Sequence, residues 1–115
     1  MAFRDHELMA GGAHIEARDS ALEATPLHLA ADFNHPDSVK TLVDVYKASI
    51  NAGNKNGRTA LHYAAYRGNT DVVRALVSQC DVTIRDSYGD TAADDARSRG
   101  HEDIVALLET KVEGK

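Results

Sequence analysis

Two histidines occupy the same place in two nearly identical stretches of the chain. In "TPLHLAAD" His28 follows Thr25 by three residues, and in "TALHYAAY" His62 follows Thr59 by three residues. An imidazole beside a hydroxyl could act as a general base, and two imidazoles could bind zinc. A general base needs a nucleophile or a substrate pocket around it, and the sequence around these histidines indicates neither. We therefore interpret both histidines as structural.

The other histidines and the single cysteine do not form a metal-binding pattern. His6, His14, His35 and His101 are scattered, and no Cys–His or His–His spacing matches a closed zinc site. Cys80 is the only cysteine, so it has no disulfide partner within the chain, and we expect an inert, at least half-buried thiol. This usage is typical of a reducing compartment, here the cytoplasm, the nucleus or both.

Two pairs of neighbouring carboxylates could work as an acid and a base. Asp94-Asp95 and Glu102-Asp103 lie near the starts of two expected helices, where negative charge complements the helix dipole. The sequence contains no phosphate-binding loop, dinucleotide fingerprint or serine elbow. We predict no catalytic residue, no metal site and no cofactor, and we do not expect an enzyme.

The composition indicates one globular domain and excludes two kinds of partner. The chain has 115 residues, of which 43% are hydrophobic. Its net charge of −5, from 18 acidic and 13 basic side chains, argues against nucleic acid, which requires clustered positive charge. No apolar run could span a bilayer, and "MAFRDHELMAGG" does not predict a signal peptide. We expect neither nucleic acid nor membrane as a partner.

The elements that must position these side chains are repeated along the chain. Thr25, Thr59 and Thr91 recur at intervals of 34 and 32 residues, and such a period indicates stacked supersecondary units. Each copy predicts a short helix, a polar turn and a second, amphipathic helix. The apolar residues of the second helix form one stripe at i, i+3 and i+4. They are Val39, Leu42 and Val43, then Val73, Leu76 and Val77, then Ile104, Leu107 and Leu108.

Capping and turn residues predict where helices begin and where the chain reverses. The three threonines are good N-caps, and Pro26 suits the first helical position because it lacks an N–H. Gly57 and Gly89 are expected to take a positive φ at the tips of projecting hairpins. The segment from Asp19 to Thr25 is one residue longer and has no glycine, so we expect a different tip there.

These motifs resemble the ankyrin repeat, a unit of 33 residues with the signature T-P-L-H-x-A. Thr25 to Ala30 match that signature, "TALHYAA" follows it with one substitution, and "RGHEDIVALL" is similar to the family's second helix. The resemblance covers residues 7 to 110 and implies an all-α ankyrin-repeat solenoid of paired antiparallel helices with β-hairpin turns. We expect a single domain over residues 1–115, with a partial repeat at 1–18, repeats at 19–53 and 54–85, and a capping repeat at 86–115.

Stacking explains the repetition, because one such unit cannot bury its own apolar face. Small side chains let the first helices approach closely; they are Ala30, Ala31, Ala64 and Ala65. The resemblance implies that His28 and His62 bridge backbone groups beside the capping threonines. His35 to Asn54 is one residue longer than usual, and Asn69 to Asp86 is one shorter. We expect both changes to alter only the shape of loops.

The third copy is expected to be the C-terminal cap, because no further repeat covers it and its outer face must be polar. It has Ala93-Asp94 in place of the Leu-His pair. The charged side chains that we assign to this polar unit are Asp95, Arg97, Arg99, Glu102 and Asp103.

The resemblance also implies that tips and first helices form a concave face that binds a protein or a peptide. Tyrosine and arginine, which are enriched at binding hot spots, gather at the contact positions of the family. The predicted contacts are Phe33, Lys55, Arg58, Tyr66, Arg67, Tyr88 and Arg99. Tyr66 beside Arg67 is the strongest candidate, whereas Phe33 could instead pack against the next repeat.

Two functions remain open at this point. The first is a protein–protein interaction module that is itself a monomer. The second is a structural spacer, or a fragment of a larger ankyrin array, with no partner of its own. The incomplete first unit somewhat favours the spacer.

Overall fold

The computed structural model describes residues 23–113, with side chains up to residue 110, and contains three pairs of helices. In the first pair α2 (Pro26–Asp32) is followed by α3 (Pro36–Lys40), which continues into a π-helical turn, η1 (Thr41–Val45). The later helices are α4 (Ala60–Arg67), α5 (Thr70–Val77), α6 (Ala92–Ser98) and α7 (Glu102–Glu113). The described residues include no β-strand. The turns that were predicted as β-hairpins are instead loops closed by backbone hydrogen bonds.

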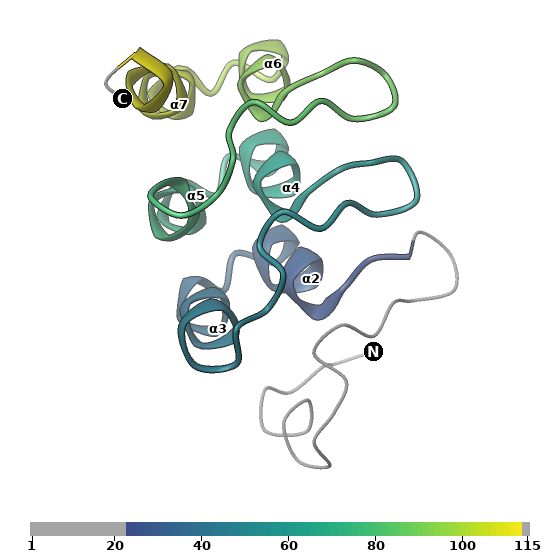
Figure 1. Cartoon of the computed structure of the whole chain (residues 1–115). Helices are drawn as coiled ribbons and strands as arrows, with labels where there is room; N and C mark the ends of the chain where they lie inside the picture. Colours follow the sequence, from purple (N-terminus) through teal and green to yellow (C-terminus); the bar gives the residue numbers. More distant parts are fainter. Residues whose placement is uncertain (1–22, 114–115) are drawn as a thin grey trace.

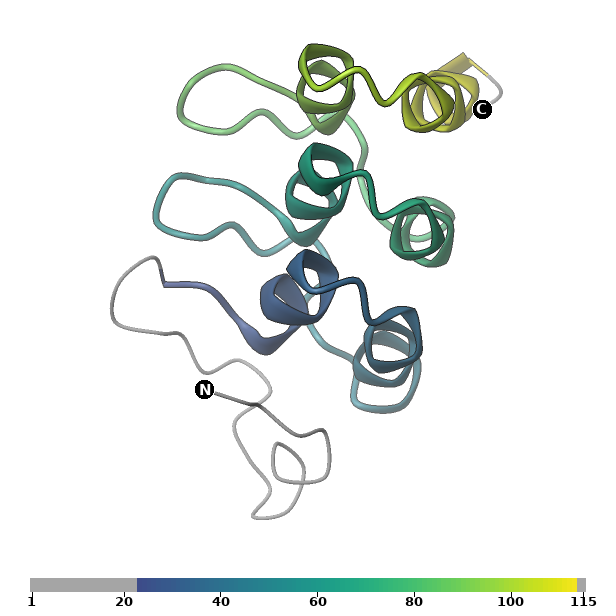
Figure 2. The same ribbon diagram turned by 180° about the vertical axis from the view of Figure 1, so that it is seen from behind.

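The helix pairs are stacked in the order of the sequence and form two layers. The first helices α2, α4 and α6 make one layer, and α3, α5 and α7 make the other (Figure 1). The loops between the pairs project from the first layer, away from the second helices, in both views (Figure 2). We call the surface made by α2, α4, α6 and the tips at residues 53–58 and 86–90 the inner face.

The predicted N-caps are confirmed at Thr25, Thr59 and Thr91. Each threonine hydroxyl accepts a hydrogen bond, at 3.2–3.3 Å, from the backbone N–H three residues later. The side chain of that later residue accepts in turn from the backbone N–H of the threonine, at 3.0 Å. Each helix therefore starts with a capping box. The reciprocating residues are His28, His62 and Asp94.

The core follows the predicted apolar stripes. The residues of the second helices that are fully enclosed are Val39, Val72, Val73, Leu76 and Ile104. Val77 and Leu107 remain partly exposed at the edge of the core. In the first layer, alanines with no exposed surface let the helices approach closely, as expected. They are Ala31, Ala64, Ala65 and Ala96.

The one extra residue of the first repeat is accommodated in its second helix, as a π-helical turn. The backbone N–H of Tyr46 donates to the carbonyl of Thr41, five residues earlier, at 3.2 Å. The prediction that only loops change was therefore wrong for this repeat. At the wider turn Val45 and Tyr46 are exposed, while Leu42 stays 2% exposed in the core. The extra length is therefore accommodated without turning the apolar stripe out of the core.

The predictions for the tip glycines and for the burial of Cys80 are confirmed. Gly57 and Gly89 have φ values of 73° and 85°, as expected for the tips, and Cys80 is buried. The partial repeat at 1–18 and residues 19–22 of the first tip lie outside the described residues. Within the part that is described, no helix is long and apolar enough to cross a membrane.

Candidate partner-binding face

Asn54 and Asp86 hold the two described tips in the same shape. Each side chain accepts, through Oδ1, from the backbone N–H groups two and four residues later, at 2.8–3.0 Å. The backbone closes each tip with a further hydrogen bond to the carbonyl four residues later, at 2.8 and 2.9 Å. The motifs did not predict these anchors. Their signal is an Asn or Asp five residues before the capping threonine.

His28 and His62 connect each first helix to the tip that follows it. Since Nδ1 accepts from the backbone N–H of the capping threonine, Nε2 carries the proton and donates. Its acceptors are the carbonyl oxygens of Arg58 and Asp90, both at 2.8 Å. Each histidine is only 1% exposed. The structural interpretation of these histidines is confirmed.

Arg58 is a predicted partner contact, but its guanidinium is bound within the molecule. Nη1 lies 2.7 Å from a carboxylate oxygen of Asp86, and Nη2 lies 2.6 Å from one of Asp95. The Arg58 side chain is 20% exposed, whereas those of Asp86 and Asp95 are 0% and 8% exposed. Assigning Asp95 to the polar outer face of the cap was wrong, because α6 turns this residue towards the preceding repeat.

Asp86 and Asp95 share one guanidinium, and their pKa values move in opposite directions. Burial raises the pKa of Asp95, and the hydrogen bond and charge of Arg58 do not fully offset it. Burial also acts to raise the pKa of Asp86, but two backbone N–H groups of its own tip, together with Arg58, lower it. Burial opposes the charge of Arg58, yet its two carboxylate partners raise its pKa above the ordinary value. Arg58 therefore stays protonated.

This cluster is also the one group of three possible metal ligands among residues 23–110. Atoms of His62, Asp86 and Asp95 lie within 4.8 Å of one another. The guanidinium of Arg58 already binds both carboxylates, and Nε2 of His62 donates to the carbonyl of Asp90. The positive charge that the carboxylates require is thus supplied by the chain itself.

Tyr66 lies at the centre of the inner face, beside two arginines. Tyr66 lies on α4 and is 42% exposed. The guanidinium carbon of Arg99 lies 4.8 Å from the centroid of the Tyr66 ring, and that of Arg58 lies 5.9 Å away. Both distances fall within the range of cation–π attraction. Arg99 is itself exposed, so a partner that reaches Tyr66 also meets a positive charge.

Arg67 follows Tyr66 and forms an ion pair with the preceding repeat. Its Nε lies 2.7 Å from Asp32, and the two side chains are 56% and 18% exposed. The hydrogen bond and the charge of Asp32 raise the pKa of Arg67. Because the arginine is largely in water, such a pair contributes at most about 1 kcal/mol, and the guanidinium remains accessible.

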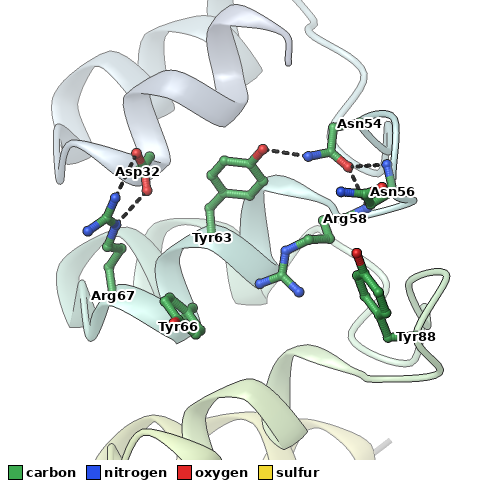
Figure 3. A pocket seen from close by; sticks show the side chains of 8 residues that line it. All are labelled: Asp32, Asn54, Asn56, Arg58, Tyr63, Tyr66, Arg67 and Tyr88. Carbon is green, nitrogen blue, oxygen red and sulfur yellow. Dashed lines mark hydrogen bonds and ion pairs between the residues drawn. The ribbon is translucent and has the colours of Figure 1, made fainter. Parts of the chain in front are cut away.

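An open hollow of about 410 Å³ lies on the inner face (Figure 3). Four of the predicted contacts line it, namely Arg58, Tyr66, Arg67 and Tyr88. The other lining residues are Asp32, Asn54, Asn56 and Tyr63. No sequence motif indicated Tyr63, whose hydroxyl accepts from Nδ2 of Asn54 at 2.5 Å (Figure 3).

The other three predicted contacts, Phe33, Lys55 and Arg99, do not line the hollow but are exposed. Phe33 is 63% exposed directly after α2, so its ring is mostly in solvent and is not buried against the next repeat. Tyr88, at the edge of the hollow, is 70% exposed. Exposed aromatic and cationic side chains thus extend from α2 to the tip of the third repeat.

Stacked helix pairs with aligned tips define a helical solenoid, in which each unit contacts only its neighbours. The family described as ankyrin repeats (3 copies) matches residues 6–86 and, in an overlapping match, residues 27–113. The chain therefore belongs to the ankyrin repeat family.

Several characterised proteins contain a similar segment. The chain is 36% identical over 97 residues to alpha-latrotoxin-Lg1a of Latrodectus geometricus, covering 82% of the chain and 7% of that protein. It is 37% identical over 106 residues to a transient receptor potential cation channel subfamily A member 1 homolog of Caenorhabditis elegans, covering 90% and 8%. For human Rabankyrin-5 the values are 37% over 76 residues, 64% and 6%. The chain thus spans less than a tenth of each relative.

Proposed function

We propose that the chain is a protein-binding module whose partner lies across the inner face. Ankyrin repeats are generally protein–protein interaction modules. The observation that carries the proposal for this face is Tyr66, which is exposed at its centre, 4.8 Å from the guanidinium of Arg99 and beside the hollow. Tyrosine and arginine are the residue types most often found at binding hot spots.

The spacing of the exposed side chains supports an extended contact. Phe33 follows α2, Tyr66 lies on α4, and Tyr88 lies on the tip of the third repeat. A peptide, or the edge of a folded domain, can touch one or two of these residues in each repeat. The hydrogen-bonded tips limit the ordering that binding requires.

We further propose that the chain has no catalytic activity of its own and acts in the cytoplasm or nucleus. The groups best suited to acid–base chemistry are already used in holding the repeats together. Both nitrogens of His62 have backbone partners, and Asp86 and Asp95 bind Arg58. The single, buried cysteine is consistent with a reducing compartment.

A structural spacer is the second candidate, and two observations favour it. The relatives contain the matching segment within much longer chains. Arg58 and Arg67, two of the predicted contacts, already have carboxylate partners inside the molecule. A spacer would keep these contacts and bind nothing on the inner face.

Capture of partners with a matched pair of variants separates the two functions. Tyr66→Ala combined with Arg67→Ala removes the centre of the inner face. Asp71→Ala combined with Arg74→Ala removes an exposed i,i+3 pair from α5, in the other layer. Partners bound by the wild-type chain are identified by mass spectrometry and their affinities measured. We expect the first variant to lose at least about 2 kcal/mol of binding free energy, and the control to lose none.

Circular dichroism must first show native helicity in both variants. Equal affinity of the folded inner-face variant and the wild-type chain would place the site elsewhere and favour the spacer.

A further inference from the structure

Exposed charge is divided unevenly between the two layers of the described structure. The layer of second helices carries mainly acidic side chains in solvent, and these are Asp37, Asp44, Asp71, Glu102, Asp103 and Glu109. Its exposed basic side chains up to residue 110 are Lys40 and Arg74, and a third, Lys47, lies directly after η1. This layer therefore repels an acidic partner.

The inner face has the opposite character. Its acidic side chains are largely paired within the molecule, since Asp32 binds Arg67, Asp86 and Asp95 share Arg58, and Asp94 lies 3.5 Å from Arg97. Lys55 and Arg99 are exposed and form no ion pair with any described residue.

Asp90 is the exception on the inner face, because its carboxylate has no ion-pair partner among the described residues. It is only partly exposed, whereas Lys55 and Arg99 are exposed. The charge that a partner can reach on this face is therefore mainly positive, although the whole chain carries a net charge of −5.

The hollow places apolar surface beside that positive charge. The rings of Tyr63, Tyr66 and Tyr88 contribute to its lining. Arg99 lies 4.8 Å from the centroid of the Tyr66 ring. A volume of about 410 Å³, open to solvent, has room for a large apolar side chain. A carboxylate next to that side chain in a partner would come close to Arg99.

We propose that the inner face recognises an acidic linear segment of another protein. An apolar side chain of the segment occupies the hollow, and neighbouring Asp or Glu residues pair with Arg99 and Lys55. This inference rests on the proposed function and names the chemistry of its partner. A peptide is favoured over nucleic acid because the accessible cations are few and separated, and the other layer is acidic.

Selection from a display library of random linear peptides tests the inference with the full chain as bait. We expect enriched peptides to carry a large apolar residue flanked by Asp or Glu. The most enriched peptide is then synthesised, labelled and titrated by fluorescence anisotropy. Arg99→Glu should weaken its binding by about tenfold or more. Arg74→Glu, the same charge reversal on α5, should leave the affinity unchanged.

Reversing the charge on both the peptide and the protein gives a second test, in which the expected result is stronger binding. Damage to the fold cannot produce such a gain. A copy of the peptide with Lys in place of its acidic residues should bind the Arg99→Glu variant better than it binds the wild-type chain. Affinity of the original peptide for the wild-type chain should fall as salt is added, because ion pairs at an exposed face are screened.

Several results would overturn the inference. Enriched peptides that are basic or uncharged would show that the face binds peptides of another chemistry, and the proposed function would stand. Absence of any enriched peptide, or displacement of the peptide by a single-stranded oligonucleotide at similar concentration, would also contradict it. The partner-capture experiment with Tyr66 and Arg67 decides separately whether the proposed function fails.

Discussion

The two junctions between neighbouring helix pairs share the same neutral contacts but differ in their charges. The first junction joins α2 to α4, and the second joins α4 to α6. At the first, His28 donates to the carbonyl of Arg58, and at the second, His62 donates to that of Asp90, both at 2.8 Å. The imidazole thus fixes the following tip in the same way at each junction.

At both junctions, the residue that precedes the second helix contacts a backbone carbonyl of the preceding repeat. Nδ2 of Asn69 donates to the carbonyl of Ala31 at 2.8 Å across the first junction. Nε2 of His101 lies 3.2 Å from the carbonyl oxygen of Tyr66 across the second. Both satisfy a carbonyl at the end of the preceding first helix, where intrahelical partners run out.

Charge distinguishes the junctions. The first has the exposed pair of Arg67 and Asp32. The second has Arg58 held between Asp86 and Asp95, with both carboxylates almost fully buried. Neutral hydrogen bonds therefore set the spacing of the repeats, while the ion pairs differ from one junction to the next. We expect sensitivity to charge substitution to be concentrated at the second junction.

Arg58→Ala should have the largest effect on stability. It leaves two buried carboxylates close together with no cation between them, which typically costs about 3–5 kcal/mol for a buried pair. Since Arg58 is 20% exposed, we expect a value near the lower end, about 3 kcal/mol. Urea unfolding followed by circular dichroism measures it.

Arg67→Ala is the matched control at the first junction, and its exposed pair should contribute at most about 1 kcal/mol. Equal losses from the two arginine variants would contradict the difference between the junctions.

Arg58 also shows where prediction from sequence reaches its limit. Threonine caps and apolar stripes are local patterns, so they predicted the helices. The family resemblance, which rests on local motifs, implied the role of His28 and His62. The partners of Arg58 lie 28 and 37 residues away, and no local pattern connects them. Comparing equivalent positions of successive repeats would not have found the pair with Asp86 either, because Asp90 is the residue equivalent to Arg58, and Asp86 is equivalent to Asn54.

Removal of either histidine should have the next largest effect. We expect His62→Ala to lower the free energy of unfolding by about 1–3 kcal/mol, because buried backbone groups lose their partners. His28→Ala should lose somewhat more, since the His28 ring also packs against the Tyr63 ring in an edge-type arrangement, with centroids 5.2 Å apart. Denaturant midpoints measure both effects.

An unchanged denaturant midpoint for either histidine variant would show that the shared contact does not hold that junction. Partner binding should survive in any histidine variant that remains folded.

Two glycines allow the second junction to be compared with the last described helix pair. Gly68 and Gly100 follow α4 and α6, with φ values of 78° and 79°. A Cβ on Gly68 would lie 2.7 Å from the ring of His101, whereas a Cβ on Gly100 would meet nothing within 4 Å. Gly100→Ala should cost about 1 kcal/mol, from backbone strain alone.

Gly68→Ala should cost more than Gly100→Ala, because it also displaces His101 from the second junction. Thermal unfolding of the two variants measures the difference. Equal losses would mean that His101 can move away without weakening the junction.

The smallest expected effect is a dependence on pH confined to the second junction. The pKa of Asp95 is raised above its ordinary value of 3.8, so the folded chain binds a proton there more readily. Its contribution to stability is present below pH 3.8 and is lost as the pH rises through the raised pKa. The pKa of Asp86 is lowered, so its contribution is present above pH 3.8 and is lost as the pH falls through the lowered pKa.

Two isosteric variants separate these opposing contributions. Lowering the pH from neutral towards about 4 should stabilise the wild-type chain relative to Asp95→Asn, which cannot take up the proton. Further acidification should destabilise the wild-type chain relative to Asp86→Asn. Asn already fills the equivalent tip position at residue 54, where its Oδ1 accepts the same two backbone N–H groups, so this variant keeps the shape of the tip. Differences in unfolding free energy that do not change with pH would show that the two carboxylates do not titrate in opposite senses.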